Sequence, residues 1–283
     1  MREGDLRQQG ALFEHAHSRP VWPDGRVERR LERLRPRQLV ALREEVPLMY
    51  LPVGTIEWHE RHMPVGTDGF TAHELSLLAA ERTGGTVYPA LYWGLDEYGT
   101  SASGEIRSGM DTAADLPLPG SIYRIGHDTY ERLLMEAVAE IFRAGYKLVA
   151  LITGHGARGQ EHTIRKVALR CNEAAGYRCV VAHSSWTFGA DAVPWGGGHA
   201  GGLETALMLG LHPELVDPEE LPSRDVALVG AAESRAHPEH GPITPELGRK
   251  AVGLAAERMA EFVQAALDAL PADARPPRSA RSL

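Results

Sequence analysis

Short apolar runs alternate with amphipathic segments over most of this 283-residue chain. The apolar runs predict buried strands at 46–53, 86–92, 147–152 and 178–182. Apolar residues at helical spacing predict helices at 68–82, 127–143, 160–175, 204–211 and 249–270. Strands that alternate with helices across short turns form a parallel sheet with helices on both faces. We therefore predict one α/β domain of three layers, with a mostly parallel central sheet covered by helices.

Two segments break this alternation. Residues 26–37 hold six arginines, with Val27, Leu31 and Leu34 at helical spacing, which predicts a short amphipathic helix with a solvated basic face. Residues 94–121 are rich in Gly, Ser, Asp and Pro without periodicity, which predicts a loop over the functional site. The domain itself is predicted at 36–270, after an N-terminal arm at 1–35 and before a disordered tail at 271–283.

Composition narrows the class of protein. The formal net charge of −8 provides no broad cationic face, so we expect no nucleic-acid partner. The longest clean apolar run, at 148–152, is too short for a bilayer, and the first residues do not resemble a signal peptide, so we expect no membrane partner and a cytoplasmic location. Two cysteines, Cys171 and Cys179, predict buried thiols. Thirteen histidines direct the search toward metal chemistry.

The strongest chemical signal is LPVGTIEWHERHMPVGTD, residues 51–68. Glu57 and His59 follow a predicted strand, two residues apart, which puts both side chains on one face of an extended chain. Asp68 starts the next helix, and sites in α/β sheets form at the carboxyl ends of strands. Two carboxylates and an imidazole there indicate a metal site. Taken singly, Asp68 also suits a helix N-cap, Glu57 also suits a surface position, and His59 also suits a hydrogen-bonded loop histidine. His62 is interpreted as a supporting or solvent-exposed histidine.

Two glycine-rich segments add further histidines. His155 lies in TGHG directly after the third predicted strand, where glycines permit a ligand to approach the backbone. The segment PWGGGHAGGLET, residues 194–205, holds Trp195, His199 and Glu204 among five glycines. It indicates a mobile lid whose side chains take part in the chemistry. The alternative is a plain turn, in which Glu204 suits the positive start of a helix.

Together, VGTIEWHERHMPVGTD, TGHGARGQE and HAGGLETALML, with LPGSIYRIGHDTYERLL as a weaker match, resemble the creatininase family of metal-dependent amidohydrolases. The resemblance spans about 47–211. It implies one α/β domain, a homo-oligomer that is usually a hexamer, and two divalent ions per chain. It implies that Glu57 and His155 bind one ion, that His59 binds the other, and that Asp68 bridges them. His199 falls at the family's general acid/base, and Trp195 at a tryptophan that covers the substrate.

The chain departs from the creatinine hydrolases directly after His155. Those enzymes have an aromatic residue and then a glutamate that binds the second ion, whereas this chain has Gly156 and Ala157. We expect Glu204 to take over this metal-binding and catalytic place, with Glu161 as the next candidate. The departure argues against creatinine as the substrate.

These patterns predict a metal-dependent amidohydrolase that cleaves a C–N bond of a small amide, cyclic amide, formamide or short peptide with metal-activated water. Mixed oxygen and nitrogen ligands suit zinc, manganese and iron. Tyr98, Ser101, Glu105 and Arg107 are polar candidates for substrate binding; each also suits a solvated loop. Two alternatives stay open. One is a biosynthetic enzyme that uses the metal as a Lewis acid for dehydration, cyclisation or condensation, and the other is a non-catalytic metal-stabilised scaffold.

Overall fold

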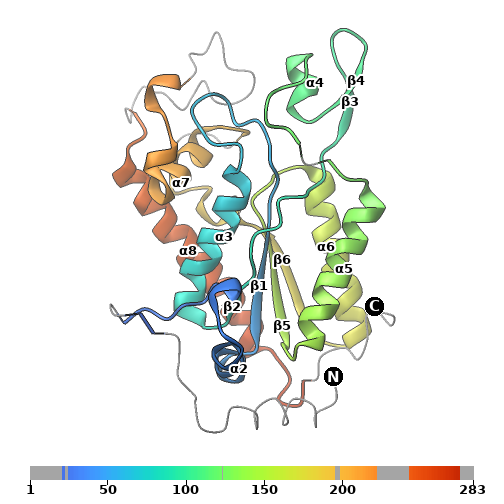
Figure 1. Ribbon diagram of the computed structural model, residues 1–283, viewed down its shortest axis with the longest axis vertical. Coiled ribbons are helices and arrows are strands. Elements are labelled where there is room, and N and C mark those ends of the chain that lie inside the picture. The colour runs from blue at the N-terminus through green and yellow to red at the C-terminus, as the bar shows by residue number, and fades with distance from the viewer. Residues whose placement is uncertain (1–20, 23–24, 123, 195–197, 222–241, 275–283) are drawn as a thin grey trace.

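The computed structural model describes residues 21–22, 25–122, 124–194, 198–221 and 242–274 (Figure 1). Within them, the strands of the central sheet are β1 (Leu48–Val53), β2 (Thr86–Val87), β5 (Leu148–Thr153) and β6 (Val180–Ser184). A separate hairpin consists of β3 (Tyr98–Thr100) and β4 (Ile106–Ser108). The α-helices are α2 (Pro36–Glu45), α3 (Thr67–Thr83), α4 (Met110–Ala114), α5 (His127–Arg143), α6 (Arg158–Ala175), α7 (Gly202–Leu211) and α8 (Pro245–Asp268). Short 3-10 turns are η1 (Leu31–Arg33), η2 (Ser185–Gly189), η3 (Pro213–Leu215) and η4 (Pro218–Glu220).

The central sheet has the strand order β2-β1-β5-β6, and each neighbouring pair is parallel. β1 and β5 pair along their whole length, from Leu48 beside Leu148 to Val53 beside Thr153. Every residue of both strands is buried. A continuous apolar run is typical of a strand that is covered on both faces. The predicted parallel sheet is therefore confirmed.

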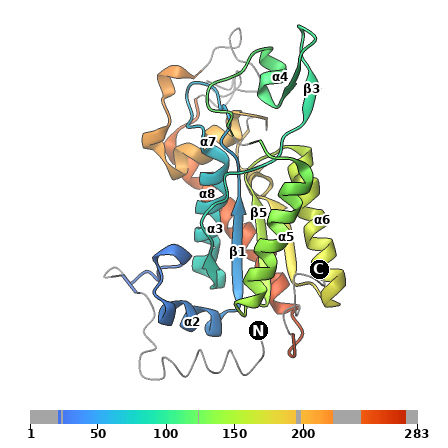
Figure 2. The same ribbon diagram turned by 45° about the vertical axis from the view of Figure 1, so that its right-hand side comes forward.

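Helices cover both faces of this sheet. In Figures 1 and 2, α3, α7 and α8 lie on one face, and α5 and α6 lie on the other. Alternate residues of β1 serve the two sides: Leu48 and Tyr50 belong to one apolar core, and Met49 and Leu51 to the other. Each face of the strand thus has its own core, as the period of two in a strand requires. The predicted three-layer α/β fold is confirmed.

Helix positions follow the predictions closely, whereas the second strand is shorter than predicted. The helix expected at 127–143 is α5 residue for residue. The strand expected at 86–92 has only Thr86 and Val87 in regular pairing. Tyr88 N still donates to Tyr50 O, but Pro52 of β1 has no N–H for the next bond of the ladder, and the following bond runs from Leu91 N to Pro52 O. The segment nevertheless keeps to the side of β1, because Leu91 forms an isolated parallel bridge with Val53.

The helix predicted at 26–37 is wrong. Residues of this segment are extended along the edge of β2, where Val87 N donates to Arg29 O at 2.8 Å. One 3-10 turn follows, and the α-helix begins only at Pro36. A proline at the first helical position is favourable, but it disfavours helical backbone at the residue before it. A helix therefore cannot run through Arg35 into Pro36, whatever the spacing of the leucines.

The segment 94–121, predicted as a loop over the functional site, has more regular structure than a loop. The segment contains the β3–β4 hairpin and α4, which stand beyond the carboxyl ends of the central strands at the top of Figure 1. Asp111 holds the end of this unit, since it accepts from Leu118 N at 2.9 Å and pairs with Arg124. The polar composition of the segment reflects these turn and capping contacts.

None of the helices in the described ranges is long and apolar enough to cross a bilayer. Cys171 and Cys179 are both buried, as predicted. Most of the predicted arm and tail lies outside the described residues. The domain boundaries, the cytoplasmic location and the hexamer stay predictions.

Candidate metal centre

A pocket of about 390 Å³ opens beside the carboxyl ends of β1 and β5. Acidic and imidazole side chains line one part of it, and Met110, Trp186 and Leu203 give it apolar walls. The topology explains the location, because parallel strands release their loops at the same edge of a sheet.

Close packing of glycines brings Asp68 to this edge. A Cβ on Gly54, just after β1, would lie 2.4 Å from Gly69 N, and a Cβ on Gly154, just after β5, would lie 2.0 Å from Asp68 O. Only glycine permits the first turn of α3 to approach the two strand ends so closely. Asp68 is thereby buried, and its Oδ2 accepts a hydrogen bond of 2.7 Å from Thr55 Oγ1.

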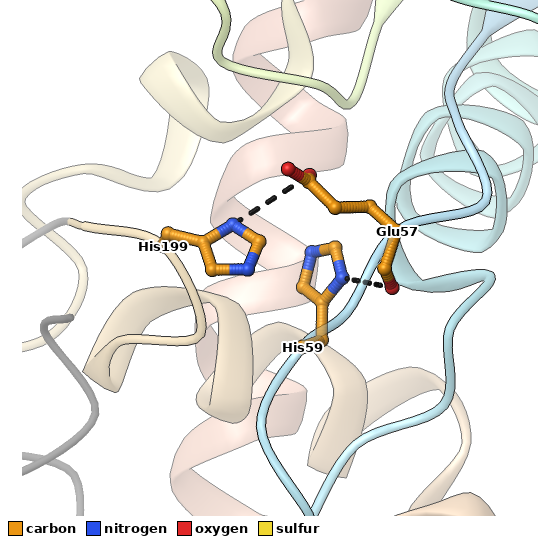
Figure 3. Close-up of side chains that lie close together, drawn as sticks. All are labelled: Glu57, His59 and His199. Carbon is orange, nitrogen blue, oxygen red and sulfur yellow. Dashed lines mark hydrogen bonds and ion pairs between the residues drawn. The ribbon is translucent and has the colours of Figure 1, made fainter. Parts of the chain in front are cut away.

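Glu57 and His59 come from the segment that follows β1, and both are buried. His59 Nδ1 lies 3.1 Å from the backbone carbonyl of Glu57, a contact drawn in Figure 3. A carbonyl oxygen only accepts, so Nδ1 carries the hydrogen. The other ring nitrogen, Nε2, therefore presents its lone pair, and it lies 3.1 Å from Asp68 Oδ1.

His155 repeats this arrangement on the other side of Asp68. Its Nε2 donates to the backbone carbonyl of Leu95 at 2.9 Å. Its Nδ1 lies 3.1 Å from Asp68 Oδ2 and 3.1 Å from Glu57 Oε2. Asp68 thus offers one carboxylate oxygen to each histidine. In metal sites, a histidine ligand commonly donates its other ring N–H to a backbone carbonyl or a carboxylate.

The electrostatics of the cluster call for positive charge between these groups. Burial lowers the pKa of His59, but Asp68, Glu204 and Glu57 together outweigh burial and raise that pKa to about 10. Burial likewise opposes the charge on His155, whereas Glu57 and Asp68 raise its pKa well above the usual range. The pKa of Asp68 is held low against burial by His59 and His155. Two lone-pair nitrogens that face ionised oxygens require protons or metal ions between them.

His199, just before α7, and Glu204, in the first turn of α7, complete the cluster. The His199 ring centroid lies 4.4 Å from that of His59, and Figure 3 shows its Nδ1 directed at Glu57 Oε2, 3.6 Å away. Its Nε2 donates to the Trp58 carbonyl. Glu204 Oε2 accepts from Ala200 N at 2.6 Å and lies 3.8 Å from His59 Nε2. Burial raises the pKa of Glu204 to about 7.

The donor set fits divalent ions. Two ligand atoms that are each about 2.1 Å from one ion lie roughly 3.0 to 3.4 Å apart at tetrahedral or octahedral angles. The 3.1 Å separations around Asp68 match this spacing. Three sets of residues could each hold an ion, because within each set one ligand atom per residue lies within 4.8 Å of the others. The sets are Glu57 with His59 and His199, Glu57 with Asp96 and His155, and His59 with Asp68 and Glu204.

Several other predicted site residues lie apart from this cluster. Tyr98 is 69% exposed on β3, and Arg107 on β4 pairs with Glu105 at 2.5 Å, so neither lines the pocket that we expected them to line. Glu161 accepts from Ser184 and pairs with Arg165, away from the metal-ligand groups.

The two remaining residues have different outcomes. His62 is buried and bonded to Thr205 at 2.9 Å, which makes it a supporting histidine and not an exposed one. Trp195 lies outside the described residues.

The pocket residues that the sequence analysis missed include Asp96, which lies with Glu57 and His155, and Trp186 from η2. A signal for Asp96 existed. It follows the second predicted strand, and the rule that placed Glu57 and His155 at strand ends applies equally to the end of that strand. Trp186 has no such signal, since an aromatic residue beside a strand is ordinary core composition.

Comparisons with known proteins agree with the fold and the motifs. The creatininase family model, described as creatinine amidohydrolase, matches residues 32–271. A creatinine amidohydrolase of Pseudomonas putida is 29% identical over 215 residues, which cover 67% of this chain and 76% of that protein.

Among solved structures, a variant creatininase of Zn-Zn type superposes with a TM-score of 0.63 at 23% identity, over 87% of this chain and 100% of that chain. A structure titled creatininase Mn superposes with a TM-score of 0.63 at 24% identity, over 86% and 100%. With a family model that covers most of its length, the chain belongs to the creatininase family.

Proposed function

We propose that the protein is a metal-dependent amidohydrolase that cleaves a C–N bond of a small amide, cyclic amide, formamide or short peptide with water. The observation that carries the proposal is the pair His59 and His155. Each donates one ring N–H to a backbone carbonyl and presents its other nitrogen 3.1 Å from an oxygen of Asp68. This arrangement suits two ions with Asp68 between them.

Glu57 and His155 would hold one ion, and His59 and Glu204 would hold the other, with one oxygen of Asp68 toward each. Divalent ions in such a pair activate water as a nucleophile near neutral pH and polarise a carbonyl group. Solved creatininases include a form titled Zn-Zn type and a form titled Mn, which supports zinc or manganese at this site. Iron suits the same ligands.

His199 would move the proton in this reaction. Burial lowers its pKa, so the imidazole is neutral near pH 7 and can accept a proton. It would take a proton from the attacking water and deliver it to the leaving nitrogen as the C–N bond breaks. The carbonyl carbon then carries the hydroxyl group, and the nitrogen leaves as an amine. The apolar walls at Met110, Trp186 and Leu203 would limit bulk water around the reacting groups.

The substrate is proposed to differ from creatinine. The Pseudomonas putida relative carries creatinine in its name, but the identity is only 29%. Gly156 and Ala157, directly after His155, both line the pocket and bring no carboxylate to it. The pocket therefore has more room beside His155 than an aromatic residue and a glutamate would leave.

The proposal is tested by metal content and turnover together. Protein purified without chelator or nickel should contain about two divalent ions per chain by elemental analysis. It should hydrolyse at least one member of a panel of amides, lactams, formamides and dipeptides, with creatinine as the reference. His59→Ala and Asp68→Ala should lose turnover and metal while keeping the circular dichroism of the wild type. His162→Ala, which changes an exposed histidine on α6, should keep both.

Turnover in water labelled with oxygen-18 separates hydrolysis from the biosynthetic alternative. Label in the product shows that water was added, whereas a product that has lost water or closed a ring would replace this proposal with the Lewis-acid reading. Protein that neither contains metal nor takes it up would contradict both.

A further inference from the structure

Asp96 is a pocket carboxylate that lies in none of the three sequence motifs. It follows the segment that runs beside β1, and it is half-buried at the pocket wall. Its carboxylate lies with the ligand atoms of Glu57 and His155, all within 4.8 Å of one another. We propose that Asp96 is a protein ligand of the divalent ion held by Glu57 and His155. This inference rests on the proposed function, since it requires that the site bind metal.

The backbone next to Asp96 is tied directly to His155. The carbonyl of Leu95 accepts from His155 Nε2 at 2.9 Å, which fixes the tautomer that exposes the other ring nitrogen. The N–H of the same residue donates to Gln160 Oε1, also at 2.9 Å. One residue therefore orients the histidine ligand and positions the neighbouring carboxylate. This coupling distinguishes Asp96 from an acidic residue that lies near the pocket by chance.

Gln160 anchors this arrangement to the sheet. Its side chain is fully buried, and its Nε2 donates to Thr153 Oγ1 at 2.9 Å, at the end of β5. Because both the oxygen and the nitrogen of this buried side-chain amide form hydrogen bonds, moving it would leave buried polar groups without partners, which costs free energy. The backbone beside Asp96 is therefore held in place relative to His155 by contacts within the protein.

Gly94 permits the chain just before Asp96 to pack closely against Thr55 and Gln160. A Cβ at this position would lie 2.3 Å from Thr55 Cγ2 and 2.4 Å from Gln160 Oε1. Any other residue would push the chain away from the end of β1, and Asp96 would move with it. The position of the Asp96 backbone thus depends on contacts with Gln160 and His155 and on the small size of Gly94.

The proposed ligand set is rich in oxygen. Glu57, Asp68 and Asp96 would supply carboxylates to this ion, and His155 would supply one nitrogen. The other ion would have His59, Asp68 and Glu204. Hard oxygen donors favour manganese or magnesium over softer ions. Asp96 would accordingly make the Glu57–His155 position the more manganese-selective of the two.

Glu97 provides a matched control. It is the next residue, it carries the same charge, and it also lines the pocket. Its Oε1 accepts from Gly159 N at 3.0 Å at the start of α6, so its carboxylate has a different partner. A general loss of negative charge at the pocket would affect Asp96→Asn and Glu97→Gln alike, whereas loss of a ligand would affect only the first.

The experiment titrates metal-free wild type, Asp96→Asn and Glu97→Gln with manganese chloride, and electron paramagnetic resonance measures the unbound ion. Wild type and Glu97→Gln should bind two ions per chain. Asp96→Asn should bind one of the two at least about tenfold more weakly, or lose it. With cobalt(II) as the probe, the visible absorption of Asp96→Asn should differ from that of the wild type, since a ligand change alters the coordination of the ion. If Asp96→Asn does not fold, Asp96→Ser takes its place.

Two results would overturn the inference, and they are distinct. Two ions with unchanged affinities and an unchanged cobalt spectrum in Asp96→Asn would refute the role of Asp96 and leave the proposed function standing. A wild type that binds no divalent ion would refute the proposed function itself, and the ligand role with it.

Discussion

Metal binding should release protons, because the same nitrogen atoms hold protons when no ion is present. Burial opposes charge on the imidazoles, but Asp68, with Glu204 and Glu57, raises the pKa of His59 to about 10, and Glu57 and Asp68 raise that of His155 well above its usual range. Both rings therefore carry a second proton in metal-free protein at pH 7.5. An ion can bind only the neutral ring, so each proton must leave first.

The size of the effect follows from these groups. His59 and His155 give about two protons per chain when both ions bind at pH 7.5. Glu204, whose pKa burial raises to about 7, adds a fraction of a proton. Affinity must rise with pH, because protons compete with the ions, and each released proton changes the binding constant by about one decade per pH unit.

Isothermal titration calorimetry in buffers with different ionisation enthalpies measures this number directly. The slope of the observed enthalpy against the buffer enthalpy gives the protons released per chain. His62→Gln serves as the control, since burial lowers the pKa of His62 to about 4 and this ring is already neutral. Tight binding of two ions with no proton release would refute the reasoning, because it would mean that both ligand histidines are neutral beside ionised carboxylates.

Two further predictions concern stability and are checked by urea unfolding. Gly154→Ala should lower the free energy of unfolding by about 1–3 kcal/mol or more, since its Cβ would lie 2.0 Å from Asp68 O. As its control, Gly253→Ala, in open space on α8, should raise the free energy of unfolding by about 0.5–1 kcal/mol. Tyr130→Phe should leave the free energy of unfolding unchanged, because the buried Tyr130 hydroxyl has no hydrogen-bond partner among the described residues. Tyr50→Phe should lower the free energy of unfolding by about 1 kcal/mol, because it removes a buried hydrogen bond of 2.7 Å.

The fold was predictable because local and global signals agree along most of the chain. The helix at 127–143 has a continuous apolar face and a glycine on either side, and α5 has those bounds. The prediction of a helix in the arginine-rich segment 26–37 was wrong for a local reason. Its leucines have helical spacing, but the restriction that Pro36 places on Arg35 decides where the helix starts. Spacing alone does not register such a restriction.

The candidate site was predictable only where its residues follow clear strands. Glu57 and His155 come after β1 and β5, whose apolar runs are uninterrupted, and the strand-end rule brings them together. Asp96 also follows a predicted strand, at 86–92, but it lies inside the polar segment 94–121, whose composition predicted only a loop. Its placement also depends on Gly94, which in sequence is indistinguishable from an ordinary loop glycine; only the packing of Gln160 against it reveals the close approach.

The segment 94–121 shows why residue type alone is a poor guide to a binding site. Tyr98 and Arg107 have suitable chemistry, but the hairpin that carries them stands away from the strand ends. The same segment reaches the pocket through Asp96 before the hairpin and through Met110 after it. A polar residue near the ions and an apolar residue at the wall thus come from the two ends of one structured unit. Substrate selection should therefore depend on how the hairpin and α4 are packed, since a shift of that unit moves Met110 at the pocket wall, whereas Leu95 keeps the backbone beside Asp96 bound to His155 and Gln160.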